Sequence, residues 1–222
     1  QPDAQERLSS AARKLSVNTS SHGEGSSAGP VNSRQPSKLL SGLFRRVDPE
    51  RRLTVLEIGP ALPETVDFFS QFKCRLHFVD LFNEPFLREE QASLSEKELR
   101  HRFESMLKFS EGTQLDILLL WDFLSFLDDA ALRAFNSALR PWIHPASLAH
   151  GFGSHHMAIK RENIQYGVID RETLSVRSRL GAVMPFHPHS QIEMHEMFNN
   201  FDFERGLLLP NGKLEMLLKP RA

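Results

Sequence analysis

Short apolar runs alternate with charged, amphipathic stretches along most of the chain after Leu39. The runs at 53–58, 76–79 and 115–120 are almost continuously apolar, as expected of parallel strands that are buried on both faces. A charged segment at 86–109 carries apolar residues at helical spacing and is expected to cross between strands as amphipathic helices. The alternation predicts an α/β domain with a mostly parallel central sheet and helices on both faces.

The other elements follow from cap, turn and periodicity signals. We expect helices at 39–44, 63–72, 128–139 and 189–199, and further strands at 106–109, 147–152 and 166–169. The sequence Pro210-Asn211-Gly212 lies between two apolar runs at 201–209 and 213–218, which predicts a closing antiparallel hairpin. The region 153–189 is otherwise irregular and is expected to be an insertion.

The first 38 residues differ in composition from the rest of the chain. They are rich in Ser, Gly, Asn and Gln and nearly free of large apolar residues. Such a segment cannot bury enough apolar surface to offset the entropy of ordering, so we expect a disordered tail at 1–38 and one domain at 39–222. Leu8 to Leu15 has some helical spacing, and this part of the tail is a candidate for folding on a protein partner.

Composition narrows the class of protein further. With 222 residues, 40% hydrophobic and 25% charged, the chain can form one substantial core. A net charge of −1 gives no global signal for nucleic acid or an acidic membrane as partner. The single cysteine, Cys74, excludes an internal disulfide and is expected to be a packing residue. No apolar run reaches the roughly 20 residues of a membrane-spanning helix, and no secretory leader is visible, so we expect a cytoplasmic protein.

Candidate chemistry lies where the first two apolar runs end. The first run closes on Glu57 and Gly59, which indicates a buried strand entering a tight turn. The second run closes on Asp80, at roughly the 20-residue spacing of the ribose-binding carboxylate in nucleotide-binding α/β folds. The two positions therefore predict a nucleoside site at the carboxyl ends of parallel strands.

The series Glu57-x-Gly59-x-Ala61-x-Pro63, then Asp80, then the segment 116–122 resembles the first, second and fourth motifs of class I S-adenosylmethionine-dependent methyltransferases. This resemblance covers most of the chain after Leu39. It implies a Rossmann-like class I methyltransferase fold with a C-terminal antiparallel hairpin, S-adenosylmethionine as cofactor, and an insertion at 153–189 over the cofactor edge. The cofactor-binding residues that it implies are Glu57, Gly59, Pro60, Ala61, Asp80, Leu81, Trp121 and Asp122.

Within this set the resemblance assigns separate roles. Glu57 and Gly59 would lie beside the amino-acid moiety of the cofactor, Asp80 at the ribose hydroxyls, and Trp121 with Asp122 at the edge of the transfer site. The turn departs from the family pattern, because Ala61 and Pro63 replace glycines. Ala61 adds a Cβ, and proline removes an N–H, although it is well tolerated in the first turn of a helix.

Catalytic and metal-binding residues are less clearly marked. Methyl transfer needs orientation more than an acid–base apparatus, so no universal catalytic residue is expected. His155, His156 and Tyr166 follow the expected fifth strand and are candidates for a base or a substrate contact, with surface or lid residues as the alternative. The set His187, His189, Glu193 and His195 matches no specific metal-site spacing, and we expect no metal there.

Three functions are compatible with these patterns. The leading one is a methyltransferase that acts on an unknown acceptor, and its rival is a catalytically inactive methyltransferase-fold protein that serves in binding or scaffolding. The glycine departures favour the rival, whereas the order of Glu57, Asp80 and Asp122 favours the enzyme. A nicotinamide-dependent oxidoreductase is disfavoured, because its third small residue would fall on Glu64.

Overall fold

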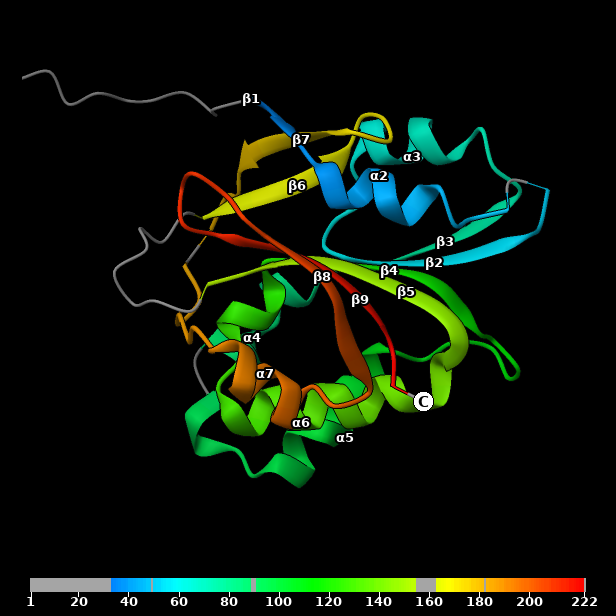
Figure 1. Ribbon diagram of the computed structural model, residues 1–222. Helices are drawn as coiled ribbons and strands as arrows, with labels where there is room; N and C mark the ends of the chain where they lie inside the picture. Colours follow the sequence, from blue (N-terminus) through cyan, green and yellow to red (C-terminus); the bar gives the residue numbers. More distant parts are fainter. Residues whose placement is uncertain (1–32, 49, 89–90, 155–162, 182, 222) are drawn as a thin grey trace, which may run out of the picture.

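The computed structural model describes residues 33–48, 50–88, 91–154, 163–181 and 183–221 (Figure 1). Within these residues the main sheet has six strands in the order β3-β2-β4-β5-β9-β8. Their bounds are β2 (Leu53–Ile58), β3 (Cys74–Val79), β4 (Leu115–Trp121), β5 (Ile143–Gly153), β8 (Phe201–Leu208) and β9 (Leu214–Pro220). Strands β2 to β5 are parallel to one another, and β9 is antiparallel to both of its neighbours, β5 and β8.

This topology confirms the expected Rossmann-like class I methyltransferase fold. The strands β3 and β4 lie on opposite sides of β2, so the strand order reverses at β2. Ligands of open α/β sheets bind at such a reversal point. The predicted hairpin is confirmed as β8 and β9. The strand expected at 106–109 is wrong, because Met106 ends α5 (Glu96–Met106) and residues 107–114 form no strand. Leu107 is fully buried as the C-cap of that helix, so its apolar character serves the helix end.

Helices cover both faces of the sheet (Figure 1). One face carries α4 (Pro85–Arg88), α5, α6 (Asp129–Leu139) and α7 (Gln191–Met197), and the other carries α2 (Lys38–Phe44) and α3 (Pro63–Phe69). Short 3-10 turns are η1 (Leu81–Asn83), η2 (Gln91–Ser93), η3 (Phe123–Phe126) and η4 (Arg140–Trp142). The buried apolar residues form two clusters, one on each side of the sheet.

The helix signals read from the sequence correspond to caps in the structure. The side chain of Asp128 accepts from the backbone N–H of Ala131 at the start of α6, as predicted. Pro63 begins α3, which ends at Phe69, so this helix is shorter than the 63–72 range read from the sequence. Helix α7 also ends earlier than expected, at Met197, with Ser190 as its N-cap.

A second sheet lies over α3 (Figure 1), and the sequence revealed only one of its strands, the one expected at 166–169. It contains β1 (Ser33–Pro36), β6 (Ile164–Val168) and β7 (Thr173–Ser178) in the order β1-β7-β6, with all neighbours antiparallel. The range expected as a tail therefore includes a strand and the start of α2, and residues 1–32 lie outside the described residues. Because β1 pairs with a strand more than a hundred residues away, no local pattern marks it.

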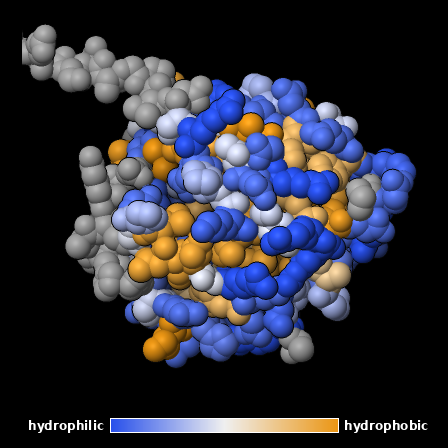
Figure 2. Space-filling model, turned by 45° about the horizontal axis from the view of Figure 1, so that its top comes forward, coloured by the Kyte–Doolittle hydropathy of each residue, from blue (hydrophilic) through white to orange (hydrophobic). Residues whose placement is uncertain are grey.

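The surface combines charged and apolar areas. In the view of Figure 2, apolar side chains gather over the middle of the face and are bordered by hydrophilic ones. The large apolar residues that are exposed are Val66, Leu180, Val183, Ile192 and Leu208. Among the described residues, no helix has both the length and the apolar character needed to cross a membrane.

Candidate cofactor site

The turn after β2 has the conformation that the glycine at its first position allows. Gly59 has φ +143°, which L residues rarely adopt, and no atom lies within 4 Å of the place where a Cβ would stand. Its N–H donates to the carbonyl of Val79, 2.9 Å away, so the turn is joined to the end of β3. Ala61 is exposed and Pro60 half-buried. Ala61 and Pro63 stand where the family pattern has glycines. Ala61 occupies an exposed position and Pro63 the first position of α3, and neither residue is strained there.

Glu57 is a buried acid at the end of β2. Only 2% of the residue is exposed, and the indole Nε1 of Trp121 donates to its Oε1 at 3.1 Å. Its Oε2 is buried without a hydrogen-bond partner in the part of the chain that the structure describes. Burial raises the pKa of Glu57 to about 8, the hydrogen bond from Trp121 works in the opposite direction, and the nearby charge of Glu64 raises the pKa further. Glu57 is therefore mostly protonated at pH 7.

Asp80 follows β3 at the neighbouring strand end. Its Oδ2 accepts a short hydrogen bond from the side-chain amide of Asn83, and its Oδ1 is buried without a partner among the described residues. The next residue, Leu81, has a fully buried side chain in the hydrophobic core. Asp80 thus presents an acceptor oxygen at the strand ends, whereas only the backbone of Leu81 can face a ligand.

Trp121 and Asp122 end β4 with different surroundings. Trp121 is 2% exposed, and its ring stacks on that of Tyr166 with centroids 5.6 Å apart. It has φ +51°, an unusual value for a bulky side chain that costs on the order of 1–3 kcal/mol. The indole lies on the same face of the sheet as Ile117 and Leu119, where it reaches Glu57. Asp122 is 7% exposed and lies toward Arg179.

Arg179 brings a positive charge to the strand ends, and no sequence pattern marked it. It follows β7, and 8% of the residue is exposed. Its guanidinium lies 3.4 Å from the centroid of the Phe82 ring, and its Nη2 lies 3.8 Å from Oδ1 of Asp122. Burial lowers the pKa of Arg179, while the charges of Asp122 and Asp80 raise it. Both acidic residues therefore already face one cation of the chain itself.

The small sheet is hydrogen-bonded to the start of α3. The carboxylate of Glu64 accepts from Arg177 Nη2 at 2.7 Å and from the hydroxyl of Ser175. The backbone N–H of Val168 donates to Thr65 Oγ1 at 3.0 Å. Gly167 permits this close approach, because a Cβ there would lie 2.9 Å from Glu64. The insertion thus lies against the helix that follows the Gly59 turn.

Of the three candidates for a base or a substrate contact, the structure describes only Tyr166. Tyr166 is 1% exposed, stacks between Trp121 and Phe152, and its hydroxyl accepts from Lys213 Nζ at 3.1 Å. It is therefore a core residue that supports the site from behind. His155 and His156 lie outside the described residues.

The residues considered for a metal do not form a cluster of ligands. His189 Nε2 donates to the carbonyl of Leu127 at 2.7 Å, and His195 contacts Arg221. Glu193 accepts from Ser190 in the capping box of α7. Among the described residues, no group of three or more His, Cys, Asp or Glu side chains is arranged to hold a metal ion.

A second polar cluster lies inside the domain between α2, β5 and β9. Glu215 is fully buried and accepts from the hydroxyl of Ser37, from the backbone N–H of Leu39 at 3.1 Å and from His150 Nε2 at 3.0 Å. Burial alone would raise the pKa of Glu215, but the hydrogen bonds from His150 and Ser37 outweigh it and lower the pKa. Serine and histidine donate to the same carboxylate oxygen, so this cluster holds α2 on the sheet and is no nucleophilic triad.

Comparison with known proteins gives matches in structure alone. No family model matches the chain, and no curated protein sequence matches it. A 1,6-didemethyltoxoflavin-N1-methyltransferase of Burkholderia thailandensis, solved with S-adenosylhomocysteine, is 14% identical with a TM-score of 0.47, over 83% of this chain and 78% of that one. An S-adenosylmethionine-dependent methyltransferase of Clostridium acetobutylicum is 9% identical with a TM-score of 0.48, over 83% and 89%.

A third match is the glycopeptide N-methyltransferase MtfA in complex with S-adenosylmethionine, at 13% identity and a TM-score of 0.44, over 82% of this chain and 93% of that one. Identities and scores at this level carry no functional detail to this chain. The fold itself rests on the order and direction of the strands. On that topology, the chain has the Rossmann-like fold of class I methyltransferases.

Proposed function

We propose that the protein is an S-adenosylmethionine-dependent methyltransferase with an acceptor still to be identified. The observation that carries the proposal is the set of three acidic side chains, Glu57, Asp80 and Asp122, at the carboxyl ends of the adjacent strands β2, β3 and β4. They surround the point at which the strand order reverses, beside the open turn at Gly59.

The polar atoms at these strand ends suit the groups of the cofactor. Oε2 of Glu57 and Oδ1 of Asp80 are buried oxygens without a hydrogen-bond partner in the described part of the chain, and Oε2 of Glu57 becomes an acceptor once this group loses the proton that its raised pKa retains. The ammonium and ribose hydroxyls of S-adenosylmethionine are donors, and buried polar atoms gain most from such partners. Asp80 would accept from the ribose hydroxyls, and Glu57 would face the amino-acid moiety.

When bound, S-adenosylmethionine would supply a methyl group to an in-line nucleophile and leave as S-adenosylhomocysteine. The residues of the chain would contribute orientation and charge. Asp122 lies at the edge of β4, where its carboxylate can stabilise positive charge. Arg179 competes for this carboxylate, because its guanidinium lies 3.8 Å from Asp122.

The second candidate function is a catalytically inactive protein of the same fold. The position of Arg179 favours it, because a buried guanidinium beside Asp122 and over Phe82 supplies the positive charge that the sulfonium would otherwise bring. In that case the strand ends would be part of a binding or scaffolding protein.

Calorimetric titration with S-adenosylmethionine and, separately, S-adenosylhomocysteine distinguishes the two. We expect micromolar binding by the unaltered chain and loss of binding by Asp80→Ala, with an unchanged melting temperature. Asp67→Ala is the matched control, because Asp67 is exposed on α3. Absence of binding at millimolar ligand, by protein shown to be folded, would favour the inactive protein. Unchanged affinity of Asp80→Ala would remove Asp80 from its role.

A further inference from the structure

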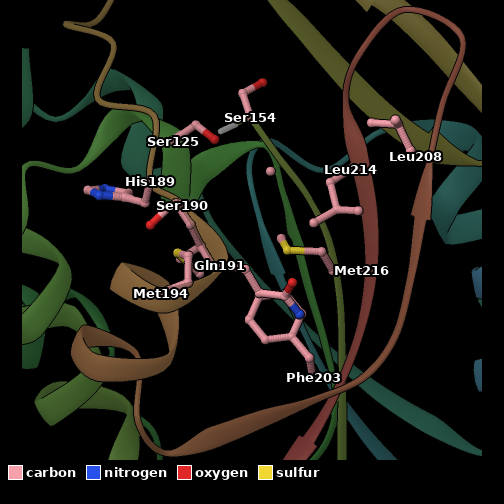
Figure 3. A pocket seen from close by; sticks show the side chains of 12 residues that line it. Ser125, Ser154, His189, Ser190, Gln191, Met194, Phe203, Leu208, Leu214 and Met216 are labelled. Carbon is pink, nitrogen blue, oxygen red and sulfur yellow. The ribbon is translucent and has the colours of Figure 1, made fainter. Parts of the chain in front are cut away.

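A separate cavity of about 240 Å³ opens beside the strand ends, and the cofactor residues do not line it. It lies between η3, the end of β5, helix α7 and the β8–β9 hairpin (Figure 3). Leu124 and Ser125 belong to η3, the turn that has Asp122 as its N-cap, so this wall of the cavity is two to three residues along the chain from Asp122.

Apolar side chains form most of the cavity wall. Figure 3 shows Met194 of α7 and Met216 of β9 on opposite sides, with the ring of Phe203 closing one end. Leu208 of β8 and Leu214 of β9 complete the side formed by the hairpin. Methionine side chains are flexible and polarizable, and they make favourable contacts with aromatic rings. This wall therefore suits a flat, apolar ligand.

The opposite end of the cavity is polar but uncharged. Figure 3 shows the side chains of Ser125 and Ser154 at that end, and both residues are almost fully buried. A serine hydroxyl can donate and accept, so it can pair with a neutral polar group on a ligand. Among the described residues that line the cavity, none is Lys, Arg, Asp or Glu. The ring of His189 points away from the cavity and donates to the carbonyl of Leu127.

Volume and chemistry together define a ligand class. A dry apolar cavity of about 150 Å³ suffices for benzene in another protein, so a cavity of about 240 Å³ has room for a fused bicyclic molecule. A charged ligand would lose hydration without gaining an ionic partner from the wall. We propose that this cavity binds a neutral, largely apolar monocyclic or bicyclic molecule that carries a hydroxyl or similar polar group at the end near Ser125 and Ser154.

Binding of this class of molecule is independent of the proposed function, whereas its role as methyl acceptor rests on that function. The polar end of the cavity lies next to the chain segment that begins at Asp122. A hydroxyl held between Ser125 and Ser154 would be the group of the ligand that lies nearest to Asp122. The acceptor would accordingly be a small aromatic or alicyclic alcohol. Its oxygen would form the bond to the methyl carbon as the sulfur–methyl bond breaks, so that S-adenosylhomocysteine leaves and the hydroxyl proton passes to solvent.

Methyl NMR of the full chain with 13C-labelled methionine tests the site without any cofactor. The probe is 2-naphthol, and 2-naphthoate is its charged counterpart. We expect 2-naphthol to shift the methyl signals of Met194 and Met216 in a saturable way and to leave Met106, at the far end of α5, unchanged. Signals are assigned with Met194→Leu and Met216→Leu. 2-Naphthoate should bind at least about tenfold more weakly.

A blocking variant makes the site assignment specific. Leu214→Trp fills the cavity from the partly exposed start of β9 and should abolish the shift of Met194, whereas Leu180→Trp, at an exposed position outside the cavity, should not change it. If Leu214→Trp does not fold, Leu208→Trp at the exposed rim replaces it. No saturable shift, equal shifts at all methionines, or equal binding of the naphthoate would overturn the proposal. Failure to bind S-adenosylmethionine would remove only the acceptor role.

Discussion

Glu57 and Glu215 are both buried glutamates of the central sheet, yet their pKa values move in opposite directions. Glu215 receives three hydrogen bonds, from Ser37, Leu39 and His150, and its pKa is lowered. Glu57 receives one from Trp121, and its pKa is raised to about 8. For Glu57 the effect of burial outweighs its hydrogen bonds, whereas for Glu215 the hydrogen bonds and the nearby His150 outweigh the effect of burial.

The two glutamates therefore differ in what they offer a ligand. Glu215 has its charge compensated inside the fold and acts as a fixed link between α2, β5 and β9. Glu57 keeps one oxygen without a hydrogen-bond partner in the described residues, next to an open turn. A polar group left unsatisfied at a strand end favours binding of a ligand that can satisfy it. Stability is expected to depend on Glu215, and cofactor affinity on Glu57.

Removing Glu215 should give the largest effect. Glu215→Ala leaves the donors of Ser37, Leu39 and His150 buried without their acceptor, and we expect the free energy of unfolding to fall by about 3–5 kcal/mol. Urea unfolding followed by circular dichroism measures the loss. Glu204→Ala is the control, because it breaks a partly exposed pair with Arg46 and should cost about 1 kcal/mol or less. Equal losses for the two variants would contradict the structural role of Glu215.

The pH dependence of stability should separate the two glutamates next. The pKa of Glu57 is about 8 in the folded state against an ordinary 4.5, so between these values the folded state binds more protons than the unfolded state. Its contribution to stability is therefore lost as pH rises, by about 1.4 kcal/mol per pH unit. Glu215, with a lowered pKa, loses its contribution as pH falls below the ordinary value.

Unfolding free energies of the unaltered chain and of Glu57→Gln, measured from pH 5 to 8, test this. The variant has no titrating group at this position, so its stability relative to the unaltered chain should increase steadily across the range. Glu50→Gln, at an exposed position, should run parallel to the unaltered chain. Parallel curves for Glu57→Gln as well would show that Glu57 is already ionised in the folded protein.

The main sheet and most helices could be predicted, because the signal for each of these elements lies in residues that are adjacent in the sequence. The apolar run of β4, the N-cap at Asp128 and the turn at Pro210-Asn211-Gly212 all depend on a few neighbouring positions. Of the small sheet, the strand expected at 166–169 corresponds to β6, whereas β1 and β7 were missed, because β1 pairs with β7 across most of the chain. The strand expected at 106–109 was wrong for a different reason. Leu107 is apolar because it is buried at the end of α5, and it belongs to no strand.

The candidate site was predictable only in its backbone positions. Spacing identified Glu57, Gly59, Asp80 and Asp122 as residues at strand ends, and the structure brings these strand ends together at the reversal point of the sheet. The chemistry around them comes from tertiary contacts. Trp121 of β4 donates to Glu57 of the neighbouring strand, and Arg179 reaches Phe82 and Asp122 from the insertion. Neither contact has a sequence signature.

Cofactor affinity should also depend on Glu57. Glu57→Gln is close in shape and keeps a neutral group, so the fold is expected to remain, but it cannot become the carboxylate that faces an ammonium. We expect it to bind S-adenosylmethionine about tenfold more weakly at pH 8, a loss of about 1.4 kcal/mol. Calorimetry at pH 6, 7 and 8 should show affinity that rises with pH for the unaltered chain and stays level for the variant. The same rise in both proteins would assign the pH dependence to another group.

The smallest expected effect concerns Arg179, which supplies positive charge to the acidic side of the site. Arg179→Gln removes the cation that lies 3.8 Å from Asp122, so a cationic ligand no longer competes for this carboxylate. We expect S-adenosylmethionine to bind about threefold to fivefold more tightly, a gain of up to about 1 kcal/mol, with a smaller change for the uncharged thioether S-adenosylhomocysteine. Arg171→Gln, at an exposed position in the turn between β6 and β7, is the control. Weaker binding of both ligands to Arg179→Gln would instead show that the guanidinium helps to hold the cofactor, and Arg179 would then complete the site rather than compete for it.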